Sequence, residues 1–296
     1  MDVDAEVIAE RRHLLALGYR MLGTVAEAED AVQETYARWY RLTPDERDAI
    51  ESPRAWLTRV ASRICLDVLG SARVRRESYV GPWLPEPVPT STFGTLGDAH
   101  ASADPLDRVT LDESVSTALL VVLEAMTPAE RVAFVLHDVF ALPFDEIAGI
   151  VGRSPAACRQ LATSARRRVE ERRERAVPRA EHDRVVQAFG AAAAGGDLAA
   201  LVAVLDPAVV LVADGGGRVS SARRPVQGAE NAARFLLGLA AKFTDAVIRP
   251  IETTDGLGFE VRQQGAVTGI LTLSVHDGLI TDIRMMRNPD KLTLWA

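Results

Sequence analysis

The sequence predicts a multidomain chain in which two all-α helical domains are followed by one α+β domain. Apolar residues recur at helical spacing from residue 5 to about residue 79, and again from about residue 111 to residue 175. A proline-rich stretch separates these two helical segments. Near residue 247 the pattern changes to short alternating segments divided by turn residues, which is typical of antiparallel strands.

The first domain is assigned to residues 1–80 and is predicted to be a helical bundle. Its apolar residues repeat every three or four positions, and Ser52 followed by Pro53 is typical of a capped helix start. Residues 81–108 form the predicted linker, because five prolines interrupt any regular pattern there. Within the linker, Trp83 and Leu84 either form an accidental apolar spot or dock on a neighbouring domain, and we favour docking.

The second domain, residues 109–177, contains a helix-turn-helix pattern. Thr127 and Glu130 form a capping box ahead of one helix. A short helix over 144–151, a tight turn at Gly152 and a capped helix that starts at Ser154-Pro155 follow in order.

The C-terminal domain, residues 178–296, is predicted to be α+β, and we call it the tail. Alanine-rich helices are expected over 183–194 and 229–242, ahead of strands over 247–252, 257–262, 267–275 and 279–287. Asp277-Gly278 predicts a two-residue hairpin turn, and Asp255-Gly256 predicts a second one.

Charge is distributed unevenly along the chain. The formal net charge of −7 argues against an acidic partner such as DNA for the chain as a whole. However, the window 54–76 contains six arginines and one acid, and the window 153–175 contains eight arginines and three acids. Since phosphates dock on local charge, both windows can face nucleic acid.

Other features limit the class of protein. Cys65 and Cys158 are the two cysteines, and their separation suits neither a disulfide framework nor a zinc site. No apolar run reaches the roughly 18 residues that span a bilayer. We therefore expect a cytoplasmic chain with no membrane association, metal, cofactor or catalytic residues.

The helix that begins at Pro155 carries the side chains of a DNA reader. Arginine can read guanine and glutamine can read adenine in the major groove, while a serine at the helix start can meet a phosphate. The predicted DNA contacts are Arg153, Ser154, Arg159, Gln160, Thr163, Arg166 and Arg167. The residues expected to pack inward are Ala156, Leu161, Ala165 and Val169. The alternative is a solvated arginine face on an ordinary helical hairpin.

The first basic window predicts a second nucleic-acid surface. Its residues are Arg54, Arg59, Arg63, Asp67, Arg73, Arg75 and Arg76. Trp56 or Tyr79 could stack on an unpaired base, although Trp56 also has the spacing of a core residue. The arginines after residue 70 could instead complement the C-terminal dipole of their own helix.

Three segments resemble extracytoplasmic-function (ECF) sigma factors over nearly all of residues 5–175. Residues 28–39 resemble region 2.2, and this implies that Asp30, Gln33, Glu34, Arg38 and Trp39 bind the clamp helices of the polymerase's largest subunit. Residues 52–76 are similar to regions 2.3 and 2.4, which open and read the minus-10 box. Residues 123–169 resemble region 4, which reads the minus-35 box. This resemblance implies that the segment also contacts the flap of the polymerase's second subunit.

Three further motifs resemble the signatures of the ECF41, or sigma J, subgroup. They are Trp83-Leu84-Pro85-Glu86-Pro87, Asp214-Gly215-Gly216-Gly217-Arg218 and Asn288-Pro289-Asp290-Lys291-Leu292. The resemblance implies a SnoaL-like, cone-shaped tail of the NTF2 superfamily that regulates the sigma factor from within the same chain. Arg218 stands where lysine also occurs in the subgroup.

The residues themselves leave alternatives for these motifs. Glycines permit a tight loop or a close approach, and Pro289 cannot continue a strand, so both tail motifs could simply terminate strands. We favour a hypothesis in which they hold the Trp83 linker and fix the distance between the two DNA-reading domains.

Two other functions compete with a sigma factor. An enzymatic tail could use His276, Asp245, Asp255 and Glu260, although no spacing places them at a common site, and such a fold could also hold an unidentified small-molecule ligand. A conventional repressor would need only the helix-turn-helix and not the helix over 28–39.

Overall fold

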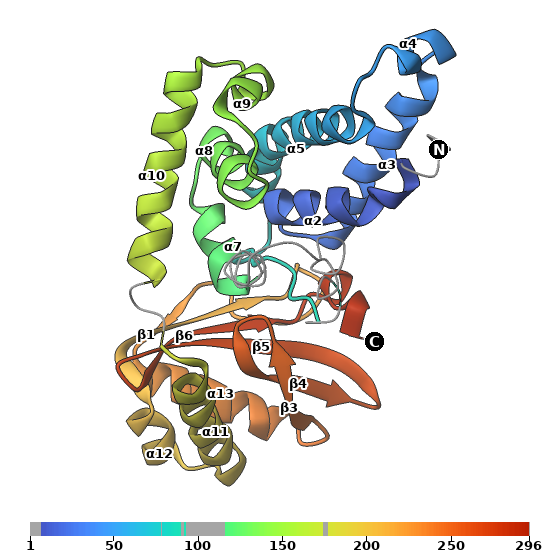
Figure 1. The fold of residues 1–296 in the computed structure, drawn as a ribbon. Coiled ribbons are helices and arrows are strands. Elements are labelled where there is room, and N and C mark those ends of the chain that lie inside the picture. The colour runs from blue at the N-terminus through green and yellow to red at the C-terminus, as the bar shows by residue number, and fades with distance from the viewer. Residues whose placement is uncertain (1–6, 78, 90–91, 93–115, 174–176, 296) are drawn as a thin grey trace. The chain divides into compact units, whose positions relative to one another are not determined.

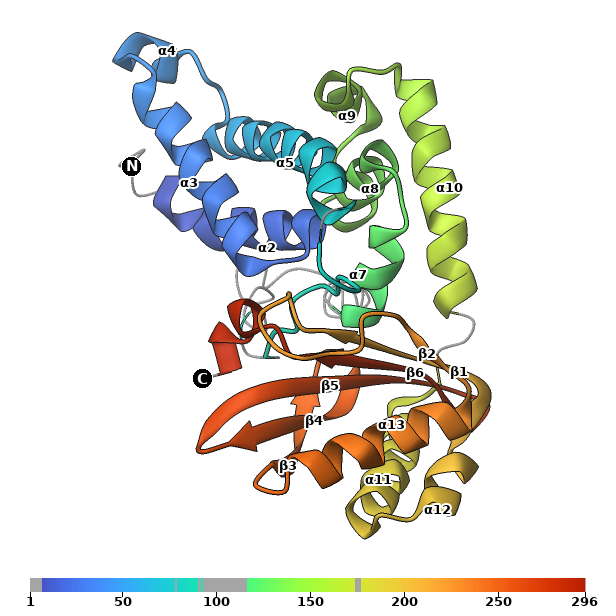
Figure 2. The same cartoon turned by 180° about the vertical axis from the view of Figure 1, so that it is seen from behind.

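The computed structural model describes residues 7–77, 79–89, 92, 116–173 and 177–295, which form two compact units (Figures 1 and 2). Unit 1 contains the described residues up to Glu77 together with Leu119–Glu170. Unit 2 contains the described part of Ser78–Thr92, Ser116–Ala118 and the described residues from Glu171 onward. The described linker residues therefore belong to the same compact unit as the tail.

Unit 1 is helical, and α2, α3 and α5 pack together around Leu17, Trp39 and Leu57. In chain order its helices are α2 (Arg11–Leu22), α3 (Val25–Arg41), α4 (Pro44–Asp48), α5 (Pro53–Glu77), α7 (Thr117–Glu124), α8 (Pro128–Phe134), the π-helix η3 (Val135–Val139), α9 (Phe144–Val151) and α10 (Pro155–Arg173). The first two residues of α7 belong to unit 2.

The helix starts predicted from the sequence are confirmed by their capping bonds. The Ser52 hydroxyl accepts from the Ala55 amide at 3.3 Å, and Ser154 accepts from Ala157 at 3.2 Å. Thr127 and Glu130 form the reciprocal capping box. Gly152 ends α9 in the left-handed region at φ 70°, so α9 and α10 form the expected helix-turn-helix.

The tail is an α+β domain with a six-stranded sheet in the order β2-β1-β6-β5-β4-β3. β1 pairs parallel with β6, and the other neighbours pair antiparallel. The strands are β1 (Leu205–Asp214), β2 (Val226–Gln227), β3 (Val247–Thr253), β4 (Gly256–Gln263), β5 (Ala266–His276) and β6 (Leu279–Met286). Helices α11 (Arg179–Gly195), α12 (Leu198–Ala203) and α13 (Ala229–Lys242) cover one face and bury Phe189, Leu211 and Leu273 (Figures 1 and 2).

The predicted strand meander is confirmed with small changes at its turns. Asp277 and Gly278 have φ values of 49° and 74°, as a two-residue hairpin turn with two left-handed residues requires. At the other turn Thr253 pairs with Gly256, so the loop residues are Thr254 and Asp255 rather than Asp255-Gly256. After β6 the chain forms two short 3-10 helices, η4 (Pro289–Lys291) and η5 (Thr293–Trp295).

Candidate functional site: the linker site and two nucleic-acid interfaces

A buried ion pair between Asp214 and Lys291 forms the centre of what we call the linker site. The two side chains are 0% and 7% exposed, and Lys291 Nζ lies 2.9 Å from Asp214 Oδ2. Asp214 ends β1, and Lys291 ends the η4 helix that follows β6. Asp214 is paired in register with Met286, at the end of the parallel strand β6. The chain therefore leaves both strands at the same end, which places the two following segments side by side. A buried charge pair needs further hydrogen bonds to offset the cost of desolvation.

The linker supplies these hydrogen bonds. The Leu84 amide donates to Asp214 Oδ2 at 3.0 Å, and Lys291 Nζ donates to the Leu84 carbonyl at 2.6 Å. The Tyr79 hydroxyl donates to Asp214 Oδ1 at 2.6 Å. The Lys291 ammonium also lies 4.0 Å from the centre of the Trp83 ring, which is a cation–π contact. One ion pair thus binds two linker residues, Trp83 and Leu84, together with Tyr79 just ahead of the linker.

The last residues of the chain extend these contacts along the linker. The Asn288 amide donates to the Tyr79 hydroxyl at 3.0 Å, and Trp295 Nε1 donates to the Pro87 carbonyl at 2.8 Å. Leu84 and Val88 are 4% and 2% exposed, and the residues between them are buried as well, namely Pro85, Glu86 and Pro87. Burial and the neighbouring Asp214 carboxylate raise the pKa of Tyr79 above its usual value.

The glycine loop after β1 allows the C-terminal segment to approach closely. Gly216 has a φ of 61°, and a Cβ atom there would lie 2.4 Å from the Asn288 side chain. Its amide donates to Asp214 Oδ1 at 2.9 Å. At the rim of the site, Arg218 Nε lies 3.2 Å from Asp290 Oδ2, with both side chains exposed. The structure therefore brings the three motifs together, and the other members of the set lie in the same segments: Gly215, Gly217, Pro289 and Leu292.

The outer face of α3 carries most of the residues predicted to bind polymerase. Asp30, Gln33 and Arg38 are exposed, and Arg38 pairs with the partly exposed Glu34 at 2.9 Å. Trp39 is wrong as a member of this surface because it is 0% exposed. It continues the inward stripe of α3 and packs edge-to-face against the half-buried Trp56, with ring centres 5.3 Å apart.

The predicted minus-10 residues lie on α5. Arg54, Arg59, Arg63 and Asp67 are exposed, whereas the side chains of Arg73, Arg75 and Arg76 lie outside the described residues. Arg63 donates to the Gly149 carbonyl at 2.8 Å, and Arg59 lies 3.8 Å from Glu146. Both partners belong to α9, so α9 already engages two of these arginines.

A buried arginine in α8 joins α7 and α8 to α2. Arg131 in α8 donates to the Met21 carbonyl at 2.7 Å and to the Leu123 carbonyl at 2.8 Å. Glu124 lies 2.6 Å from the same guanidinium, and burial lowers the pKa of Arg131 to about 9. Because Met21 belongs to α2 while Leu123 and Glu124 belong to α7, separating α2 from α7 and α8 would remove the Met21 carbonyl from a buried charge and expose the guanidinium to water.

Most of the predicted minus-35 residues form an exposed face at the start of α10. The exposed members are Arg153, Ser154, Arg159, Gln160, Thr163 and Arg167. Arg166 is half-buried and bonds to Asp138 at 2.5 Å. The inward face differs from the prediction, since it consists of Cys158, Ala162, Ala165 and Val169. Ala156 is exposed and Leu161 is only partly buried, because the helix phase is set by the capped turn at Ser154.

The four candidate acid-base residues of the tail have separate partners. Asp245 accepts from Gln263, Glu260 pairs with Arg262, and the partly exposed His276 lies 3.6 Å from Asp277. The fourth, Asp255, binds the start of α7. The candidates therefore do not share one acid-base site.

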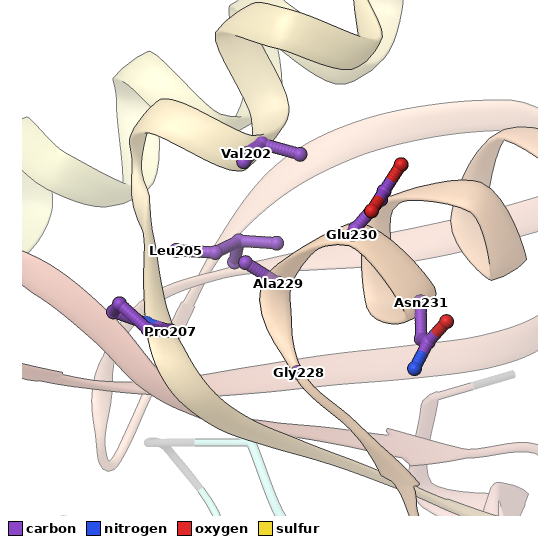
Figure 3. Close-up of a pocket in the computed structure, with 7 residues that line it drawn as sticks. All are labelled: Val202, Leu205, Pro207, Gly228, Ala229, Glu230 and Asn231. Atoms are coloured by element: carbon purple, nitrogen blue, oxygen red, sulfur yellow. The ribbon is translucent and has the colours of Figure 1, made fainter.

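A depression of about 390 Å³ lies at the start of α13 (Figure 3). Its lining consists of Val202, Leu205, Pro207, Gly228, Ala229, Glu230 and Asn231. The one charged group, Glu230, is exposed and paired with Arg234, so this depression offers little to orient a polar ligand.

Sequence reasoning missed two residues of the linker site, Tyr79 and Trp295. Both are aromatic residues that stand a few positions outside a motif, and this proximity was the available signal.

In the part of the chain that the structure describes, no helix is long and apolar enough to cross a bilayer. Cys65 and Cys158 are free and buried, and burial raises the pKa of the Cys65 thiol to about 12.

Comparisons with known proteins agree with this architecture. The Sigma-70 region 2 family matches residues 7–76, and the Sigma-70, region 4 family matches residues 116–169. SigJ, an ECF RNA polymerase sigma factor of Mycobacterium tuberculosis, is 41% identical over 98% of this chain and 93% of its own length. SigI of the same organism, a probable ECF sigma factor, is 39% identical over 98% of this chain and 94% of its own.

A solved structure is also similar along the whole length. The crystal structure of M. tuberculosis SigJ matches with a TM-score of 0.71 and 39% identity, and the match covers 98% of both chains. These relatives are transcription regulators rather than enzymes, in agreement with the expectation from the sequence. The chain therefore belongs to the family of extracytoplasmic-function sigma factors, which direct RNA polymerase core to promoters.

Proposed function

We propose that this chain carries RNA polymerase core to specific promoters in the cytoplasm and that its tail restrains this activity from within the chain. The exposed residues of α3 bind the clamp helices of the largest subunit, and region 4 binds the flap of the second subunit. The arginine face of α5 reads the minus-10 box, and the exposed face of α10 reads the minus-35 box. A small-molecule ligand lies outside this proposal.

The observation that carries the regulatory part is the buried Asp214–Lys291 pair, which binds the Leu84 amide and carbonyl. Because the linker connects the two DNA-reading domains, its attachment to the tail limits how far they can separate. Arg59 and Arg63 are engaged by α9, so promoter binding requires these contacts to open. Release of the linker therefore favours opening and raises transcription.

Promoter-specific transcription with purified core polymerase tests the proposal. The full chain should start transcription from its promoter, whereas a simple repressor would bind DNA and never confer initiation. Trp83→Ala and a chain that ends before Lys291 should both raise the output per polymerase bound. Phe243→Ala, an aromatic-to-alanine change elsewhere in the tail, serves as the control. Unchanged output from both linker-site variants would remove the regulatory proposal, and failure to associate with core would remove the proposed sigma activity of this chain.

A further inference from the structure

The turn between β3 and β4 binds the first two backbone amides of α7. Asp255 Oδ2 accepts from the Thr117 amide at 3.1 Å, and Asp255 Oδ1 accepts from the Ala118 amide at 2.8 Å. The first amides of a helix have no partners within the helix, and a carboxylate there also complements the helix dipole. A side chain that caps a helix usually comes from the adjacent sequence. Here it comes from a residue 137 positions further along the chain.

Several contacts fix the turn that carries Asp255. The Thr253 hydroxyl donates to the Gly256 carbonyl at 2.7 Å and accepts from the Asp255 amide at 3.2 Å. A Cβ atom on Gly256 would lie 2.5 Å from the buried His182 ring, so the turn lies directly against α11. Asp183 of the same helix accepts from the Leu257 amide at 2.9 Å. The carboxylate of Asp255 is therefore presented from a preorganised element.

The same turn also contacts the linker. Pro89 and Thr253 form an antiparallel bridge. Pro89 stands near the end of the described linker, and Thr117 stands near the start of the segment that matches the Sigma-70, region 4 family. The tail thus binds the chain at two places on one turn, separately from the Asp214–Lys291 pair.

We infer that Asp255 is a positioning residue that fixes the start of region 4 on the tail. The first two residues of α7 belong to unit 2, while the helix continues into unit 1 from Leu119. Holding these amides gives the tail a second restraint on region 4 besides the linker site. This inference rests on the proposed regulatory function of the tail and names a further contact that exerts it.

Hydrogen exchange and transcription on the full chain test the inference. In Asp255→Ala the Thr117 and Ala118 amides should exchange about fivefold faster, the change expected when a typical cap is lost. Asp255→Asn keeps one acceptor oxygen and should fall between that variant and the wild type. Asp277→Asn, in the hairpin turn between β5 and β6, serves as the control because its side chain is 89% exposed. With core polymerase, Asp255→Ala should raise promoter output, and the control should not.

Three results would overturn the inference. Unchanged exchange at the two amides would show that Asp255 does not hold α7. Faster exchange with unaltered transcription would show that the contact does not restrain region 4, and an equal rise in Asp277→Asn would show that the position is not specific. The proposed function fails in a different way, through unchanged output from Trp83→Ala and the truncated chain, both of which keep Asp255 and the two amides that it binds.

Discussion

Two ion pairs join the segment from Asp214 to Arg218 to the C-terminal segment, and they differ mainly in burial. Lys291 and Asp214 are 7% and 0% exposed, whereas Arg218 and Asp290 are 64% and 59% exposed. The buried pair is surrounded by the linker, and the exposed pair lies in water at the rim. An exposed pair contributes little because water screens both charges, while breaking a buried pair leaves an uncompensated charge. The buried pair therefore decides whether the linker stays bound.

Breaking the buried pair should give the largest effect. In Lys291→Met the Asp214 carboxylate keeps three hydrogen bonds but loses its counter-ion, which should cost linker binding about 3–5 kcal/mol. Hydrogen exchange at the Leu84 amide, which donates to Asp214, measures this cost. Lys242→Met, at an exposed lysine at the end of α13, is the matched control. Equal protection of Leu84 in both variants would contradict the central role of the pair.

The glycine loop should give the next largest effect. In Gly216→Ala the new methyl group meets the Asn288 side chain at a φ of 61°, so we expect a loss of about 1–3 kcal/mol in the free energy of unfolding of the tail. Gly238→Ala has no atom within 4 Å of the new Cβ and lies inside α13, so it should stabilise by up to about 1 kcal/mol. Urea denaturation measures both changes, and a neutral Gly216→Ala would show that the close approach is not required.

Removing one hydroxyl should have a smaller effect that depends on pH. Tyr79→Phe loses a donor to Asp214 and an acceptor for Asn288, at a cost of about 1–2 kcal/mol. The pKa of Tyr79 is raised in the folded state, so its contribution is fully present below the unfolded value near 10. It is lost as the pH rises from that value through the folded pKa. The difference between wild type and variant, measured by denaturation at increasing pH, should therefore shrink above about pH 10.

The exposed pair should give the smallest effect. Arg218→Ala should change the free energy of unfolding by less than about 1 kcal/mol, and the change should fall further in high salt. Denaturation at low and high salt checks this. A loss as large as that of Lys291→Met would show that burial is not what separates the two pairs.

The sequence predicted local structure well where one residue determines the outcome. The serine caps at Ser52 and Ser154 and the Asp277-Gly278 turn depend on short-range bonds, and each is confirmed. The strand β1 was not delimited because its partner β6 lies far along the chain, and parallel pairing leaves no local signal. The π-helix η3 also left no local signal in the sequence, because its apolar residues fit an α-helix equally well.

The sequence predicted most of the residues that form the linker site, but not how these residues are arranged in space. The three motifs were identified, yet no sequence pattern could show that Asp214 and Lys291 meet on the Leu84 backbone. Trp39 was assigned to the polymerase-binding surface because residues 28–39 resemble region 2.2, but its spacing also fits the inward stripe of α3, where the structure buries it. Asp255 was noted as an acid-base candidate, and its contact with α7 depends on tertiary structure alone.

The prolines of the linker limit how it can slide along its site. Asp214 needs an N–H donor, and proline has none. Moving the linker by one residue would place Pro85 where Leu84 now donates, and a shift by three would place Pro87 there. A shift by two would offer the Glu86 amide, but it would also bring a second carboxylate next to Asp214. The spacing of prolines and acid in this segment thus disfavours every register in which one of the three residues after Leu84 takes its place.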